Sequence, residues 1–157
     1  MIDSQIIKAK KIAYRMLSWK ARTEKQVRDR LLQKGIAPEA AEAVVRELLA
    51  LGYVDDRKFA REYIACRLEG KPLGPYRLRA VLLAAGVRQE LVEEELAAFF
   101  PPGREEELAV RYLTRLPDGK EYPVQKALRS LLNRGFSLQA AKRACNSLGI
   151  GLQDDIG

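Results

Sequence analysis

The chain has 157 residues, 47% of them hydrophobic and 31% charged, and this length can bury a core without disulfides or metal ions. It contains no histidine, and its two cysteines lie far apart, which excludes zinc-ligand spacing and Ser–His or Cys–His nucleophilic schemes. The start of the chain is not a signal peptide, and no apolar run is long enough to cross a membrane. We therefore expect a cytoplasmic protein that is not an enzyme, with no cofactor and no metal.

The net charge of +7 is concentrated near the N-terminus. Residues 1–34 hold ten lysines and arginines against three carboxylates, which accounts for the whole excess. Such clustering indicates contact with nucleic acid or another acidic partner, the alternative being that the charges merely solvate helices. Between Glu90 and Glu107, seven glutamates face only Arg104. The chain therefore has a basic end and an acidic middle.

An internal repeat organises the chain. The pattern Leu-Leu-x-x-Gly-apolar occurs at 31–36, 82–87 and 131–136, with helix-spaced apolar residues on both sides. Each copy predicts a helix, a loop, a second helix, a glycine turn and a third helix. We expect an all-α fold of three tandem helix-turn-helix-like repeats, packed into an elongated, curved array. The predicted domains are a basic repeat at 8–52, repeats at 55–101 and 104–149, and a flexible tail at 150–157.

Helix boundaries follow from local chemistry, beginning in the first repeat. Thr23-x-x-Gln26 is a capping box that predicts the start of the second helix. Gly35 suits the left-handed residue that ends it, and Pro38 starts the third helix. Cys66 and Cys145 fall at apolar helix positions, which favours buried packing over reactive thiols.

The Asp55–Asp56 pair precedes the first helix of the second repeat. Two adjacent carboxylates are also compatible with a magnesium site or an acid–base pair. No third acidic ligand lies nearby, so the sequence favours helix capping, by either carboxylate, for a helix beginning near Arg57.

Later boundaries repeat the same signals. Pro75 and Pro123 suit the first position of a second helix, and Ser137 starts the last one. The segment 70–75 lacks a phosphate-loop pattern, and its two prolines indicate a stiff turn instead.

A candidate basic face combines the N-terminal unit with the starts of the second helices. Cations at the same point of each repeat would lie along one side of a stacked array and track a polyanion. Trp19 is compatible with stacking on a base, but covering a helix junction is the favoured interpretation. The predicted partner-binding residues are Arg15, Lys20, Arg22, Lys25, Arg28, Lys34, Arg67, Lys71, Arg77 and Arg79.

The chain resembles the bacterial regulatory protein RecX family. The features that carry this resemblance are the Ala13–Leu17 run before a basic loop, the Leu-Leu-x-Lys-Gly ending, and Gly-Tyr-Val-Asp-Asp-x-x-Phe-Ala with Gly-Pro downstream. It is strong over 9–87 and continues as the repeat pattern to about 149. The motif positions are Gly35, Gly52, Asp55, Asp56, Phe59, Gly74, Pro75, Gly86 and Gly135.

The resemblance implies a regulator that binds the RecA recombinase filament on single-stranded DNA. It would inhibit the ATPase, co-protease and strand-exchange activities of RecA and so modulate DNA repair and recombination. The expected partners are that filament and single-stranded DNA, bound without strong sequence preference, and double-stranded DNA is a possible further partner. We expect no membrane contact and a monomeric protein. The residues alone reach only an elongated, basic binding protein. The alternative is a helix-turn-helix transcriptional regulator that reads duplex DNA.

Overall fold

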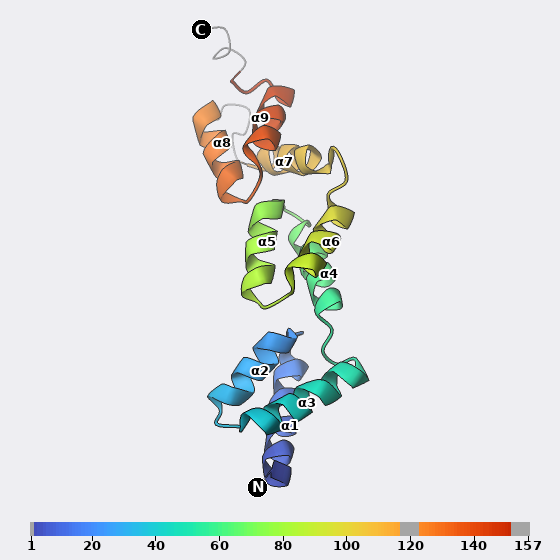
Figure 1. Ribbon diagram of the computed structural model, residues 1–157. Coiled ribbons are helices and arrows are strands. Elements are labelled where there is room, and N and C mark those ends of the chain that lie inside the picture. Colours follow the sequence, from blue (N-terminus) through green and yellow to red (C-terminus); the bar gives the residue numbers. More distant parts are fainter. Residues whose placement is uncertain (1, 117–122, 152–157) are drawn as a thin grey trace.

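The computed structural model of the chain describes residues 2–116 and 123–151, and all regular elements in these ranges are α-helices. The predicted all-α fold is therefore confirmed. Successive helices form three groups that follow one another along an elongated body, with α1 at one end and α9 at the other (Figure 1). The helices are α1 (Ile2–Trp19), α2 (Glu24–Gln33), α3 (Pro38–Leu51), α4 (Asp56–Arg67), α5 (Pro75–Ala84), α6 (Gln89–Phe99), α7 (Arg104–Thr114), α8 (Val124–Asn133) and α9 (Leu138–Ser147).

The predicted helix starts are confirmed at four positions and shifted at one. The Thr23 hydroxyl accepts the Gln26 amide at 3.1 Å, and the Gln26 side chain accepts the Thr23 amide at 3.0 Å, which completes the capping box. Pro38 and Pro75 are the first residues of α3 and α5, and Ser137 caps α9. Pro123 lies one residue before α8, as its N-cap, because its ψ of 141° is extended.

Among the described residues, apolar side chains gather into two separate cores. The first core lies among α1, α2 and α3 and includes Ala13, Leu31 and Val45. The second is continuous from α4 to α9, so that Leu78 of α5 and Phe136 beside α9 belong to one cluster. The middle and last helix groups therefore share their buried apolar surface, whereas the first group is buried on its own.

One junction rule recurs along the stack. The glycine turn between the second and third helices of one group packs on the start of the second helix of the preceding group. A Cβ at Gly86 would lie 2.4 Å from the Lys25 Cβ, and one at Gly135 would lie 2.4 Å from the Arg77 amide nitrogen. A side chain at either position would collide with the preceding helix group. Both glycines also have a positive φ, of 97° and 96°, which residues with a Cβ rarely adopt.

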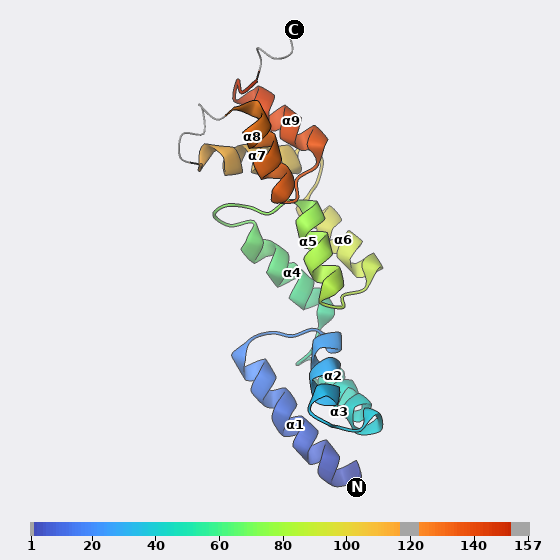
Figure 2. The ribbon, with the colours of Figure 1, turned by 90° about the vertical axis from the view of Figure 1, so that its left-hand side faces the viewer.

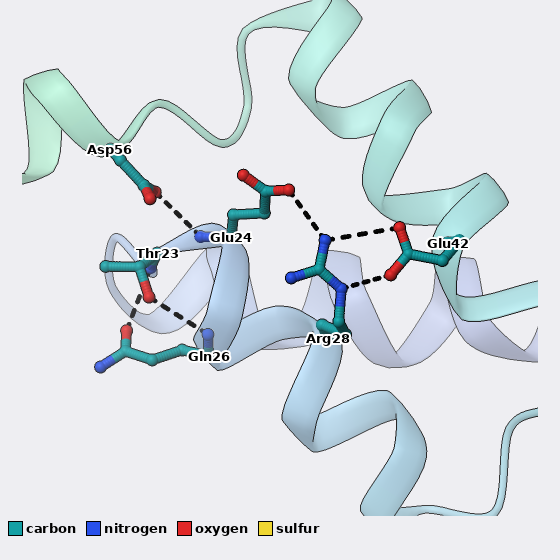
Figure 3. Close-up of polar contacts among 6 residues, drawn as sticks. All are labelled: Thr23, Glu24, Gln26, Arg28, Glu42 and Asp56. Carbon is teal, nitrogen blue, oxygen red and sulfur yellow. Dashed lines mark hydrogen bonds and ion pairs between the residues drawn. The ribbon is translucent and has the colours of Figure 1, made fainter. Parts of the chain in front are cut away.

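Asp55 and Asp56, the two candidates for the cap of α4, have different roles in the structure. Asp55 caps α4, because its Oδ1 accepts the Lys58 amide at 3.1 Å. Asp56 instead reaches back to the preceding helix group and accepts the Glu24 amide at 2.9 Å (Figure 3). Burial raises the pKa of the Asp56 carboxyl, an effect that the bond from the Glu24 amide opposes. Asp56 is thus a junction residue, which sequence spacing does not indicate.

Within the described ranges, every helix is too short or too polar to span a bilayer. The same ranges contain no gathering of three carboxylate or cysteine side chains suited to hold a metal ion. Most of the predicted tail at 150–157 lies outside the described residues.

Candidate polyanion-binding groove

A groove of about 910 Å³ lies between α1 and α2. Residues three or four positions apart share one face of a helix, and this spacing brings one row of α1 side chains opposite one row from α2 and the loop before it. The lining is strongly cationic, with Asp29 as its single carboxylate and Trp19 at the end of α1. Its basic residues are Lys8, Lys11, Arg15, Arg22, Arg30 and Lys34.

Within the part of the chain that the structure describes, the groove cations lack carboxylate partners. Asp29 pairs with Lys25 at 2.7 Å, so the one acidic residue in the lining is already neutralised. Arg30 donates only to the neutral Gln33 side chain, at 3.1 Å, and the buried Nε of Arg22 has no hydrogen-bond partner. Among the described residues, no ion pair joins any of the six groove cations to an acid. Their uncompensated charge makes the groove an attractive site for an anion.

Trp19 lies on the surface beside these cations. Its side chain is 83% exposed, so the expectation that it covers a helix junction is wrong. The physical reason is that α1 ends at this residue and no helix packs over the ring. An exposed indole among cations is the combination that binds unstacked bases.

Two of the predicted binding arginines instead hold helices together. Arg28 of α2 pairs with Glu24 at 2.8 Å and with Glu42 of α3 (Figure 3). Arg79 of α5 pairs with Glu93 of α6 at 2.6 Å, at the equivalent position of the next repeat. These hydrogen bonds raise the pKa of both guanidinium groups, and Arg79 lowers the pKa of the Glu93 carboxyl. Both arginines therefore tie a second helix to a third helix.

The remaining predicted cations are dispersed. Lys20 and Lys25 are exposed near the start of α2. Arg67 lies 5.1 Å from the centre of the Tyr63 ring, and Lys71 follows α4 in the loop that meets the third helix group. Arg77 donates to the Asn133 carbonyl at 3.4 Å across that same junction.

The structure thus gathers only part of the predicted basic face. Arg15, Arg22 and Lys34 lie together in the groove, and the other seven lie outside its lining. Sequence reasoning missed Lys8, Lys11 and Arg30 as members of the site. Helical spacing from Arg15 contains the signal for the first two, since positions 8, 11 and 15 share one face.

The acidic middle is largely neutralised within the chain. Glu93, Glu94 and Glu107 each pair with an arginine. Glu95 is only 4% exposed and accepts from Arg61 at 2.9 Å. Glu105 accepts the Ser137 amide at 2.7 Å. The glutamates of α6 and α7 therefore mainly fasten helices.

The two cysteines have different surroundings. Cys145 is buried as expected, and burial raises the pKa of its thiol. Cys66 is exposed, which contradicts the prediction that it packs in the core, because it lies on the solvent side of α4.

Comparisons with known proteins agree with this architecture. Family models for the first and second three-helix domains of RecX match residues 9–48 and 55–96. A regulatory protein RecX of Thermus thermophilus is 39% identical over 84% of this chain and 86% of its own length. The RecX of Prosthecochloris aestuarii is 30% identical over 94% of this chain and 98% of its own.

Some relatives are longer. The chain spans 57% of the length of the Leuconostoc citreum RecX, to which it is 31% identical over 94% of its own residues. The crystal structure of RecX from Lactobacillus salivarius has the same fold, with a TM-score of 0.81 at 22% identity over 94% of this chain and 98% of that one. Domain matches, relatives and fold all agree, and the chain belongs to the RecX family of regulatory proteins.

Proposed function

We propose that this protein binds the RecA recombinase filament on single-stranded DNA and inhibits its ATPase, co-protease and strand-exchange activities. The observation that supports this most directly is the α1–α2 groove, which is lined by the exposed Trp19 and by six cations that pair with no acid among the described residues. RecA as the target rests on family membership. What the groove adds is a chemical reason for contact with a filament that carries phosphates.

The groove chemistry favours a single strand over a duplex. Lysine and arginine neutralise phosphates of either form, without regard to sequence. An indole, however, stacks on a base only when that base is accessible, as it is in a single strand. Duplex binding should therefore be weaker and should rest on phosphate contacts alone. An acidic surface of the recombinase would satisfy the same cations, but base stacking by Trp19 requires the single strand.

Inhibition follows if one molecule bridges neighbouring recombinase protomers. Helices α1 and α2, whose residues line the groove, lie at one end of the elongated body, while α4, which ends at Arg67, lies near its middle (Figure 2). Contacts at both places would hold adjacent parts of the filament together. Such a brace would hinder the motion that accompanies ATP turnover or the addition of further protomers.

ATP hydrolysis by the cognate RecA on single-stranded DNA tests this proposal. The protein is titrated in as the natural chain, as a groove variant (Lys11→Glu, Arg15→Glu, Arg30→Glu), and as a surface variant (Arg88→Glu, Lys142→Glu, Arg143→Glu). The two triple variants change the net charge equally. We expect inhibition by the natural chain and the surface variant, and loss of inhibition in the groove variant, with circular dichroism verifying folding. Absence of inhibition by the natural chain at saturation would overturn the proposal.

The transcriptional-regulator alternative gains no support from the third helix of the first group. The apolar face of α3 packs inward, with Ala40, Val44 and Leu48 buried, and its exposed side offers no row of side chains suited to base edges. Sequence-specific duplex binding without any effect on the recombinase would restore that alternative.

A further inference from the structure

The two junctions of the stack differ in strength. The first, between α1–α3 and α4–α6, contains two hydrogen bonds among the described residues. The Thr23 hydroxyl donates to the Ala85 carbonyl at 2.5 Å, and the Glu24 amide donates to Asp56 at 2.9 Å. The second, between α4–α6 and α7–α9, contains five: Gly74 to Arg134, Tyr76 to Gly135, Arg77 to Asn133, Arg111 to Leu68, and Arg134 to Lys71.

Apolar burial follows the same asymmetry. One continuous core runs through α4–α9, so separating the last two helix groups would expose residues such as Leu78 and Phe136 to water. The core of α1–α3 is a separate cluster. Turning the first group against the rest therefore exposes little core, whereas turning the third group exposes much.

Open space also lies at the first junction. A hollow of about 640 Å³ there is lined by the start of α2, the end of α3, residues of the 52–55 connection, the start of α4 and the Gly86 turn. Gly52 has a φ of 78° and no atom within 4 Å of where a Cβ would be. The connection between α3 and α4 is the single chain crossing at this level (Figure 1). Val54 of this connection packs in the α1–α3 core, and the Tyr53 ring lies 6.0 Å from that of Tyr14, so Tyr53 and Val54 stay with α1–α3 and the chain is free to change direction between them and α4.

We propose that α1–α3 moves as one body about the 52–55 connection, against a second rigid body formed by α4–α9. The Asp56 carboxylate, which accepts the Glu24 amide (Figure 3), and the Thr23 hydroxyl, which donates to Ala85, form the latch that holds the arrangement seen here, because theirs are the two hydrogen bonds that cross the junction among the described residues. Hinge motion of this kind concentrates dihedral changes in a few residues between packed elements.

The hinge separates the two sets of cations. The groove lies on the mobile body, and Arg67 and Lys71 lie on the other. On the proposed function, a filament that contacts both sets would fix the hinge angle. The motion itself does not depend on that function and is tested without any recombinase.

Distance distributions between spin labels test the hinge in the intact chain. Labels are placed on cysteines introduced at Glu39, Glu90 and Gln139, which are exposed second residues of α3, α6 and α9. The background carries Cys66→Ser, and the buried Cys145 stays unlabelled. Each pair, 39 with 90 and 90 with 139, spans one junction at matched positions. We expect the 39–90 distribution to be about twofold wider than the 90–139 distribution. Equal widths would overturn the hinge.

The latch is tested by adjacent aspartates. Asp56→Ala should widen the 39–90 distribution further and leave the 90–139 distribution unchanged. Asp56→Asn, which keeps an acceptor for the Glu24 amide, should restore the natural width. Asp55→Ala is the matched control, since Asp55 caps α4 and makes no hydrogen bond to α1–α3. The latch assignment fails if Asp55→Ala widens the distribution as much as Asp56→Ala does, or if Asp56→Ala has no effect.

Discussion

Arg28 and Arg15 show how two similar side chains acquire different roles. Both belong to the basic N-terminal segment, but Arg28 lies opposite Glu42 and Glu24, whereas Arg15 lines a groove whose only carboxylate is already paired. An exposed ion pair contributes little to stability, but its carboxylate neutralises the cation that an anionic ligand would otherwise bind. The availability of each cation, rather than its presence, therefore decides which residues belong to the candidate groove.

Trp19 carries the strongest prediction for a single residue. Trp19→Ala should weaken binding to a fluorescent oligothymidylate by about 5- to 150-fold, the range expected for loss of 1–3 kcal/mol of base stacking. The melting temperature should not change, because the side chain is 83% exposed. Anisotropy titration and thermal unfolding measure the two effects, with Trp19→Phe as the control that keeps an aromatic face. Equal binding by all three proteins would exclude stacking.

Glu93 predicts a pH dependence of stability. The bond from Arg79 lowers the pKa of Glu93 in the folded chain, so its contribution is present above the ordinary carboxyl pKa and is lost as pH falls through the folded value. Because the pair is partly exposed, Glu93→Gln should lower the free energy of unfolding at pH 7 by at most about 1 kcal/mol. Urea unfolding at pH 7 and at a series of lower pH values measures the difference, which should shrink as the pH falls below the ordinary carboxyl pKa.

The exposed Glu69 provides the control for this measurement, since it forms no ion pair with any residue in the described ranges. Glu69→Gln should leave the stability at each pH close to that of the natural chain. A Glu93→Gln effect that persists in acid would show that packing, not charge, is responsible.

At the scale of elements, the glycine turn both ends a helix and forms a junction. Gly35, Gly86 and Gly135 occupy one position of the repeat, and all three have a positive φ. The first has open space around it, whereas the other two press on the preceding group. The glycine therefore only ends a helix in the first helix group, whereas in the second and third groups it ends a helix and also packs at a junction.

This difference predicts unequal costs for one substitution. Gly35→Ala should lower the free energy of unfolding by about 1–2 kcal/mol, the cost of a left-handed residue that has a Cβ. Gly135→Ala should cost clearly more, because its Cβ would lie 2.4 Å from the Arg77 amide nitrogen and force the junction apart. Denaturant unfolding of both variants gives the comparison. Equal losses of unfolding free energy in the two variants would mean that the junction accommodates the added Cβ at no cost.

At the scale of the whole molecule, three repeats form two cores. The sequence repeat predicts equivalent units, yet α4–α9 share one apolar cluster and α1–α3 keep another. The uncompensated positive charge lies on the independently packed group. The candidate binding groove therefore lies on α1–α3, the helix group whose core is separate from that of α4–α9.

Leu31 and Leu131 allow this division to be measured, since both are fully buried at equivalent repeat positions. Either change to alanine should cost about 2–5 kcal/mol within its own core. Hydrogen exchange followed by mass spectrometry should show Leu31→Ala raising exchange in α1–α3 alone. Leu131→Ala should raise it throughout α4–α9. Exchange in Leu131→Ala confined to α7–α9 would contradict the shared core.

The amino-acid sequence by itself determined the all-α fold, the repeat, the capping box at Thr23 and the left-handed glycine turns. These features depend on residues within a few positions of one another, where hydrogen bonding and helical periodicity act locally. Tertiary structure alone decided that Asp56 reaches Glu24, that Arg28 and Arg79 are occupied, and that Trp19 remains exposed. The physical reason is that each outcome depends on which distant side chains packing brings within reach, and nearby sequence does not contain that information.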